Sequence, residues 1–461
     1  MSLSRRTFLG ALAASMTAAS CASLPRLSIE KSSGSDHDYI LTAEPTPIQL
    51  VSAGPTPAWC FGGSYPAPVL RARQGQKLRV LFRNRLPEAT TIHWHGIRLD
   101  IAMDGVPYLT QPPIEPGAEF LYEFSPPDAG TFWYHPHMNS VEQLGKGLVG
   151  ILIVEEAQPV AFDLDLPLAL KTWHINEDGS FSPFSIPRNA ARMGTPGRWE
   201  TVNGQNKPVL EIPAGGLVRL RFANVDNTVI YKLAVKNHPA WVIAVDGNPV
   251  AKPYPLVAHE IGAGMRLDVA LLAPKKAGEV IQVQNGKGKL FFDFVTLKTV
   301  GEPVRGERTI PVLPLNPIPQ PDLASAESLD FVFEWEGAVT PANDHGEAHQ
   351  MFWTINRRGW DHSSEQSIPE PLAKLQLGRS YIFNLRNVTP HTHPIHLHGN
   401  TWTVLESNQR KITPYHTDTV LVRRNEKVKV AFVADNPGRW MYHCHVIEHM
   451  KTGLMGYISV A

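Results

Sequence analysis

The segment His443–His449, close to the C-terminus, contains three histidines and one cysteine within seven residues. Side chains on a β-strand alternate between its two faces, so His443 and His445 would point one way and Cys444 the other. A thiolate beside imidazoles selects copper or zinc, and two histidines with one cysteine are typical of blue-copper sites. The segment therefore predicts one strand that serves two metal sites, one on each face.

Three other segments repeat this close spacing of histidines. They are His93–His95, His135–His137 and His393–His398, and with the C-terminal segment they hold ten of the nineteen histidines. A single histidine is usually a structural residue, because imidazole serves many roles. Four such segments together with one cysteine instead indicate a shared metal centre, since each pair separated by one residue lies on one face of its strand.

In chain order these motifs read HWHG, WYHPH, HPIHLHG and HCHVIEH, and with them the chain resembles the laccase-like multicopper oxidases. The resemblance covers nearly all of the sequence after the N-terminal segment. It implies an all-β protein of three tandem cupredoxin-like Greek-key sandwiches. It also implies an oxidoreductase that uses four copper ions and takes O2 as its electron acceptor.

The resemblance implies a role for each ligand residue. For the type 1 copper the matching residues are His393, Cys444 and His449, and for the type 2 copper they are His93 and His396. For the two type 3 coppers they are His95, His135 and His445 on one ion, and His137, His398 and His443 on the other. Cys444 and His449 are the expected catalytic residues of electron transfer, with electrons arriving at an exposed edge of the His449 imidazole.

In the family that the chain resembles, the axial position of the type 1 site lies five residues after the last type 1 histidine, and Leu454 stands there in this chain. Leucine cannot coordinate, and the loss of an axial ligand destabilises Cu(II) more than Cu(I), so a high reduction potential is expected. The neighbouring Met455 would take the axial position if the backbone bulged there.

Asp104 follows His95 by nine residues and resembles the acidic residue that the family places beside its trinuclear cluster. Such a carboxylate can orient a water molecule or deliver protons, which makes Asp104 a third candidate catalytic residue. The alternative is a turn, because Asp-Gly is also a turn signal. Some relatives carry a second acid where this chain has Met450. Glu448 is expected to be a solvated surface carboxylate.

Composition favours strands over long helices. Forty prolines and thirty-five glycines separate short runs rich in Val, Ile, Phe and Trp. The length of 461 residues suggests about three domains. A weak threefold repetition predicts them at residues 39–156, 166–300 and 329–461, with a proline-rich linker at 301–328. Histidine pairs occur only in the first and third, so the second is expected to bind no copper.

Two segments show the alternation of polar and apolar residues that half-buried strands require, at 77–84 and 217–222. The charges balance, with 43 basic and 43 acidic residues, so nothing directs the protein to nucleic acid or to a membrane surface. The cysteines are Cys21, Cys60 and Cys444. We expect Cys60 to be a small buried hydrophobic residue.

The N-terminal residues 1–24 are predicted to be a targeting segment. Arg5 and Arg6 precede an apolar stretch that is too short for a permanent membrane span, which is the pattern of a twin-arginine export signal. The expected partner is the twin-arginine translocation machinery, and the expected location is the periplasm. Cys21 matches a lipoprotein box poorly, and a lipid anchor there is the alternative to simple cleavage.

The expected reactants are O2 and a small reducing substrate, and phenols or aromatic amines suit a laccase-type site. One alternative is a periplasmic cuprous oxidase, although the ten methionines form no cluster in the sequence. A loose group of His345, His349, Met351 and His362 would then bind extra metal, but a solvated loop is the simpler interpretation. A non-catalytic copper-binding or structural cupredoxin protein is the alternative from a different class.

Overall fold

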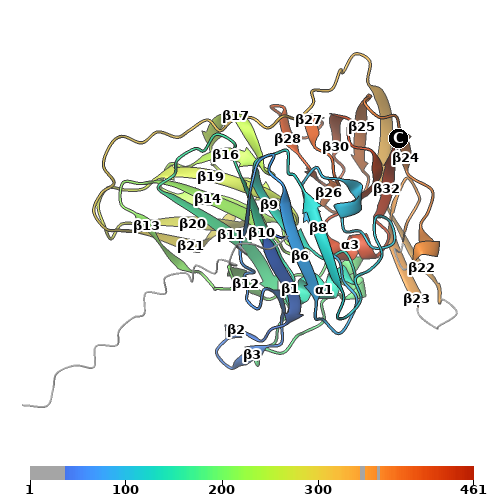
Figure 1. Ribbon diagram of the computed structural model, residues 1–461, viewed down its shortest axis with the longest axis horizontal. Helices are drawn as coiled ribbons and strands as arrows, with labels where there is room; N and C mark the ends of the chain where they lie inside the picture. Colours follow the sequence, from blue (N-terminus) through green and yellow to red (C-terminus); the bar gives the residue numbers. More distant parts are fainter. Residues whose placement is uncertain (1–36, 343–347, 361–363) are drawn as a thin grey trace, which may run out of the picture.

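The computed structural model describes residues 37–342, 348–360 and 364–461. The regular elements of this part of the chain are almost all strands, as the all-β prediction requires (Figure 1). The predicted targeting segment 1–24, with Cys21, lies outside the described residues. His345 and His362 lie outside them as well.

The first sandwich lies in the blue and cyan part of Figure 1. Its two sheets have the strand orders β4-β1-β6-β8 and β5-β10-β9-β7. The strands are β1 (Tyr39–Pro45), β4 (Trp59–Phe61), β5 (Leu70–Arg73), β6 (Leu78–Asn84), β7 (His93–His95), β8 (Glu119–Phe124), β9 (Gly130–His135) and β10 (Gly150–Glu155). Beside them lie β2 (Ile48–Val51), β3 (Gly54–Thr56), the 3-10 turn η1 (Ile101–Met103) and helix α1 (Ser140–Lys146).

The middle sandwich has the orders β12-β11-β14-β19-β16-β17 and β13-β21-β20-β15-β18. Its strands are β11 (Leu164–Trp173), β12 (Trp199–Val202), β13 (Val209–Pro213), β14 (Leu217–Asn224), β15 (Tyr231–Lys236), β16 (Trp241–Val245), β17 (Asn248–Pro255), β18 (His259–Ile261), β19 (Arg266–Leu272), β20 (Val280–Lys287) and β21 (Leu290–Val300). The short helix α2 (Pro187–Ala190) lies in the long connection between β11 and β12.

The third sandwich has the orders β23-β22-β25-β30-β27-β28 and β24-β32-β31-β26-β29. Its strands are β22 (Glu327–Ala342), β23 (Ala348–Ile355), β24 (Ala373–Leu375), β25 (Ser380–Asn387), β26 (His393–Leu397), β27 (Trp402–Ser407), β28 (Tyr415–Thr417), β29 (Thr419–Val422), β30 (Lys427–Val433), β31 (Gly438–Cys444) and β32 (Met455–Val460). The 3-10 turn η2 (Glu365–Ser367) precedes β24, and helix α3 (Ile447–Lys451) connects β31 to β32.

The three sandwiches share one topology. In one sheet of each, the parallel pairs are β1 with β6, β11 with β14, and β22 with β25. In the other sheet the parallel pairs are β5 with β10, β13 with β21, and β24 with β32. The prediction of three tandem cupredoxin-like sandwiches is therefore confirmed, while the domain boundaries in the sequence stay a prediction.

The two alternating sequence segments behave differently. In β6 the side chains alternate between buried and half-buried, as predicted for residues 77–84. In β14 every residue is buried, so the prediction of a half-buried strand at 217–222 is wrong. The polar face of β14 carries Arg219 and Arg221, which both pair with the buried Asp268. The charges of this face are matched inside the protein, because buried ions require partners.

The first and third sandwiches share a continuous apolar core. One cluster of buried side chains contains residues of the first sandwich, such as Phe82 and Trp94, together with residues of the third, such as Trp402 and Tyr442. The middle sandwich has its own core. This arrangement brings the histidine-bearing strands of the two outer sandwiches to one interface.

Two further predictions about the chain can be compared with the fold. Cys60 is fully buried in a small apolar cluster with Trp173 and Ile175, as expected. Among the helices of the described residues, none has the length and apolar character that a membrane crossing requires.

Candidate metal centre

Strand register brings the histidine segments together. In the first sandwich β7 pairs with β9, which places His93 opposite His135. In the third sandwich β26 pairs with β31, which places His396 opposite His443. Directly opposite residues of antiparallel strands lie about 5 Å apart, so each pairing gathers imidazoles on one face.

One group of possible ligands lies around the cysteine. The Cys444 Sγ is 3.6 Å from Nδ1 of His393 and 3.6 Å from Nδ1 of His449, and the two Nδ1 atoms are 3.1 Å apart. All three side chains are fully buried. A thiolate and two imidazole nitrogens converging on one point are the donor set of a blue-copper site.

The outer ring nitrogens of this group bond to the protein. Nε2 of His393 lies 2.9 Å from the hydroxyl of Thr389, and Nε2 of His449 donates to the carbonyl oxygen of Arg192 at 2.9 Å. Such outer partners orient metal-binding imidazoles and fix which nitrogen is left for the metal. Here they leave both Nδ1 atoms directed at the sulfur.

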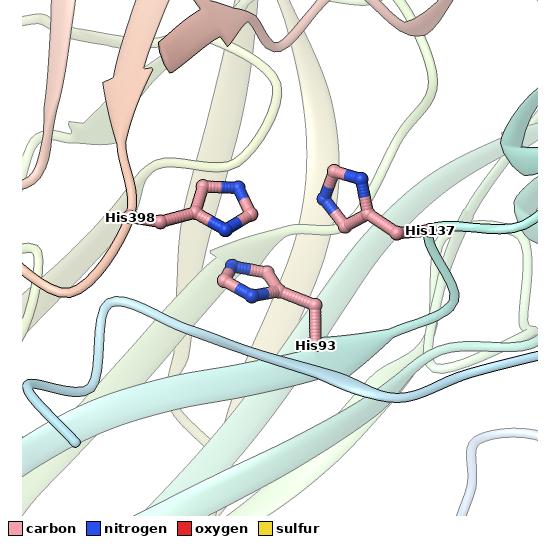
Figure 2. Close-up of side chains that lie close together, drawn as sticks. All are labelled: His93, His137 and His398. Carbon is pink, nitrogen blue, oxygen red and sulfur yellow. The ribbon is translucent and has the colours of Figure 1, made fainter. Parts of the chain in front are cut away.

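Eight more histidines form a second group at the interface of the outer sandwiches. Their ring nitrogens fall into four overlapping triplets whose atoms lie within 4.8 Å of one another. The triplets are His93–His137–His398, His93–His95–His396, His95–His135–His445 and His396–His398–His443. Figure 2 shows one triplet, with the rings of His93, His137 and His398 turned toward one another. The structure therefore gathers all ten histidines and the cysteine that the sequence singled out.

Unsatisfied nitrogens show that this second group fits metal ions. Buried ring nitrogens of four histidines have no hydrogen-bond partner among the described residues; they belong to His93 (Nε2), His95 (Nδ1), His135 (Nε2) and His396 (Nε2). Both ring nitrogens of His445 are also buried and have no hydrogen-bond partner among the described residues. A buried polar atom without a partner costs free energy, and metal coordination removes that cost.

The imidazoles have the protonation state that a metal requires. Burial lowers the pKa of His95, His135 and His398 well below the usual value, and neighbouring imidazoles lower it further. Burial likewise lowers the pKa of His449 to about 3. Neutral imidazoles are the form that binds metals.

Two buried carboxylates hold the outer nitrogens of the cluster. Asp104 accepts from Nδ1 of His398 at 3.0 Å, and its carbonyl oxygen accepts from Nδ1 of His93 at 2.9 Å. Asp418 accepts from Nε2 of His95 at 3.1 Å and lies 3.3 Å from Nδ1 of His396. The Asp104 carboxylate also lies 3.2 Å from Nδ1 of His93, so each carboxylate touches one histidine from each outer sandwich, which makes Asp104 more than a turn residue.

The middle sandwich also reaches the cluster, through Arg266. Its guanidinium forms a two-pronged ion pair with Asp418, at 2.9 and 2.6 Å, and donates to the carbonyl oxygen of Thr131 at 3.1 Å. Burial alone raises the pKa of Asp418, but this guanidinium and the bond from His396 hold the pKa well below its usual value. One buried arginine therefore contacts residues of all three sandwiches.

Two glycines make room for this arrangement. Gly96, with φ of +85°, lies where a Cβ would come within 2.4 Å of Arg266 Nη2 and 2.6 Å of Asp418 Oδ2. Gly264, with φ of +87°, lies where a Cβ would come within 2.8 Å of the His445 ring. A positive φ is also disfavoured for residues with a Cβ.

Leu454 and Met455 lie on different sides of the sheet. Leu454 is fully buried in the same apolar cluster as Cys444. Met455 lies opposite His443 in the register of β31 and β32, and it packs in a different cluster with Met441 and Ile447. These positions favour Leu454, and not Met455, as the neighbour of the cysteine sulfur.

Two expectations about exposure are wrong. His449 is fully buried, and its outer edge faces the Arg192 carbonyl instead of solvent. Glu448 is only 1% exposed, and its carboxylate accepts bonds from the backbone N–H and the hydroxyl of Thr195. Both errors have one cause, because a segment of the middle domain covers this end of the third sandwich.

Sequence reasoning missed several residues of the centre, chiefly Asp418, Arg266 and Thr195. Asp418 stands in the run His416–Thr419, which has no metal-ligand spacing. Arg266 lies in an ordinary strand of the middle domain, 152 residues from its partner. No local pattern marks such residues, because their roles arise only when the sandwiches dock.

Comparisons with known proteins agree on one family. Family models described as multicopper oxidase match residues 43–159, 131–290 and 336–461. The crystal structure of a multicopper oxidase from Pseudomonas thermotolerans is 48% identical, with a TM-score of 0.85, over 92% of this chain and 99% of that one. The structure of a multicopper oxidase from Pseudomonas parafulva is 50% identical, with a TM-score of 0.82, over 92% and 100%.

More distant relatives include the multicopper oxidase MmcO of Mycobacterium tuberculosis, which is 28% identical over 98% of this chain and 95% of its own length. Laccase-2 of Botryotinia fuckeliana is 28% identical over 86% of this chain and 77% of its own length. Taken with the histidine and cysteine geometry, these matches show that the chain belongs to the multicopper oxidases and is a copper-dependent oxidoreductase.

Proposed function

We propose that this enzyme is a laccase-type oxidase that takes electrons singly from phenols or aromatic amines. Four such oxidations supply the four electrons, and with four protons these reduce one O2 to two water molecules. The observation that carries the proposal is the placement of Cys444 between His443 and His445. Strand β31 carries the sulfur of one site and the His443 imidazole of the other, and His445 follows directly after its last residue.

The proposed ligands follow the family pattern. Type 1 copper would be held by His393, Cys444 and His449, and type 2 copper by His93 and His396. The type 3 pair would be held by His95, His135 and His445 and by His137, His398 and His443. The triplets of converging nitrogens and the unpartnered ring atoms support this assignment.

When bound, the copper ions accept electrons one at a time and deliver them to O2. The chain's own residues provide the connection, because the peptide of Cys444 joins the two sites covalently. A bond of 2.9 Å from Nδ1 of His443 to the Cys444 carbonyl oxygen adds a second link. Asp104 holds the His398 ring through a hydrogen bond, and its carboxylate can also orient a water molecule or transfer protons. Asp418 orients the His95 ring in the same way.

Three observations support aromatic donors. A curated relative over most of this chain is named a laccase. The sequence contains no methionine cluster of the kind that would bind cuprous ion. Met351, a member of the loose group, packs against Gly359 and Gly453. Cuprous ion remains the alternative donor within the same chemistry.

We also propose export to the periplasm by the twin-arginine machinery, on the strength of Arg5 and Arg6 ahead of an apolar stretch. Replacing both arginines with lysine should retain the protein in the cytoplasm. Cell fractionation with an antibody would measure this, and unchanged export would contradict the proposal.

The function is tested by measuring O2 uptake of the copper-loaded enzyme with a dimethoxyphenol, with Cu(I) and with Mn(II) in parallel. We expect uptake with the phenol and the loss of it in Cys444→Ser. If only Cu(I) is consumed, the laccase assignment is wrong while the copper chemistry stands. If no donor is consumed above the Cys444→Ser control, the oxidase assignment itself is wrong.

A further inference from the structure

The proposed type 1 site is covered by residues 185–195, which we call the cap segment. It includes α2 and belongs to the long connection between β11 and β12 in the middle sandwich. Its carbonyl at Arg192 accepts from His449, and its carbonyl at Ala190 accepts from Nε1 of Trp353 at 2.8 Å. The Trp353 ring lies 4.5 Å from the His449 ring, centre to centre. The cap segment thus excludes solvent from the edge of the imidazole.

One threonine fixes the cap segment. The Thr195 hydroxyl donates to Glu448 Oε1 at 2.8 Å and accepts from the N–H of Ile186 at 3.0 Å, which ties the two ends of the segment together. The Thr195 N–H donates to the other oxygen of Glu448. Because Glu448 precedes His449 in α3, these bonds connect the cap segment directly to the ligand-bearing helix.

Packing leaves little freedom at this contact. A Cβ on Gly194 would come within 2.9 Å of Glu448 Oε2, and Gly194 has φ of +81°. The Thr195 carbonyl accepts from Nε2 of the buried His174 at 2.7 Å. Glu448 therefore acts on a segment that is held from both sides, and its carboxylate has a specific partner instead of solvent.

The outer face of the cap segment is apolar and cationic. Ile186 is 42% exposed and Met193 is 49% exposed, and the Arg192 side chain is also exposed. Apolar side chains beside a guanidinium suit electron-rich aromatic rings.

We propose that the cap segment is the donor-binding surface and that Glu448, through Thr195, is a positioning residue that holds it against His449. An aromatic donor loses one electron at this surface, and a phenol releases its proton to solvent. The electron would pass through the Arg192 carbonyl and its hydrogen bond to His449, and a copper ion held by His449 would accept it. This inference rests on the proposed laccase-type function.

The first test loosens the cap segment without changing its outer face. Thr195→Val removes the hydroxyl at nearly constant size, and Thr195→Ser keeps it. In metal-free protein, we expect backbone amides of 186–194 to exchange hydrogen about tenfold faster in Thr195→Val, as for the loss of a buried hydrogen bond, and Thr195→Ser to retain protection. Equal exchange in both variants would overturn the role of the Thr195 hydroxyl.

The same variants are then loaded with copper. With the sulfur-to-copper absorption at full intensity, Thr195→Val should raise KM for a dimethoxyphenol more than it lowers kcat. A rise in kcat/KM would show that the cap segment obstructs donors, and would overturn the proposed electron route. If wild-type enzyme does not oxidise the phenol, the proposed function fails, and the hydrogen-exchange result still decides how the segment is held.

The second test changes only the exposed face. Met193→Ser should raise KM for the phenol about threefold, as expected for the loss of a small apolar contact, with unchanged exchange of the cap amides. Arg192→Gln keeps the backbone carbonyl and should weaken oxidation of a carboxylated dimethoxyphenol more than that of the neutral one. Val257→Ser, at a position that is 82% exposed, is the matched surface control. Equal KM values in Met193→Ser and Val257→Ser would place donor binding elsewhere.

Discussion

Most histidines of the metal centre use one ring nitrogen for the protein and turn the other toward a shared point. Asp104, Asp418, Thr389 and the Arg192 carbonyl hold the outer nitrogens. Orientation by such partners matters because a coordinating imidazole must present a specific nitrogen. Residue type and spacing predicted which histidines take part, whereas the partners on their outer sides could not be read from the sequence.

Among single residues, Leu454 is expected to control the reduction potential of the type 1 copper. Leu454→Met supplies a thioether beside Cys444, which stabilises Cu(II) relative to Cu(I). We expect the potential to fall by roughly 60 mV or more, the size of a tenfold change in a one-electron equilibrium constant. Redox titration of the visible band measures this. Leu454→Ile, which fills similar volume without coordinating, is the control, and equal potentials in both variants would contradict the axial assignment.

Asp104 allows a second test on a single side chain. Asp104→Asn keeps the shape but removes the negative charge that accepts from His398. Loss of such a partner typically lowers metal affinity or activity about 10- to 100-fold, and we expect O2 uptake to fall within that range. Absorption of the type 1 site should stay unchanged. Uptake at the wild-type rate would show that the carboxylate is not needed.

At the scale of elements, strands were the most predictable part of the fold. The alternation of residues 77–84 correctly predicted β6, and the His-Cys-His run correctly predicted a strand through His443 and Cys444, although His445 lies just beyond its end. Burial of whole faces was not predictable. The arginines of β14 look solvent-facing in the sequence, but an adjacent sandwich and matched acids bury them. The burial of His449 by the cap segment could not be predicted for the same reason, because contacts between segments that are distant in the sequence leave no local pattern.

The turn after β7 is expected to tolerate no side chain. Gly96→Ala would press a methyl group against Arg266 and Asp418, so we expect incomplete copper loading of the trinuclear cluster and a lower Tm. Gly75→Ala is the matched control. Gly75 also has a positive φ, +73°, but a Cβ at this position would meet no other atom within 4 Å. It should show only the backbone penalty of about 1 kcal/mol. Copper analysis and thermal unfolding distinguish the two, and equal losses would contradict the steric explanation.

At the scale of the whole molecule, the middle sandwich does more than separate the other two. Arg266 joins Thr131 of the first sandwich to Asp418 of the third, beside the histidine cluster. The four histidines of each outer sandwich meet there because the two cores are continuous. The sequence placed the ligands on the outer domains, but it could not show this contribution from the middle one.

Removing the Arg266 guanidinium should therefore weaken the interface of all three sandwiches. Arg266→Gln leaves Asp418 buried without its partner, a change that typically costs about 3–5 kcal/mol. We expect a lower unfolding midpoint and a loss of trinuclear copper before type 1 copper. Arg266→Lys keeps the charge but not the two-pronged geometry. Its unfolding midpoint and its copper content should therefore fall between those of the wild type and of Arg266→Gln. Denaturant unfolding with copper analysis measures both, and wild-type copper content in Arg266→Gln would contradict this role.

The cluster draws half of its eight imidazoles from residues 93–137 and half from residues 396–445. A growing polypeptide consequently has no complete set of cluster histidines until His445 has been synthesised. A product that is truncated before His445 therefore lacks part of the histidine set, whatever the first sandwich contributes.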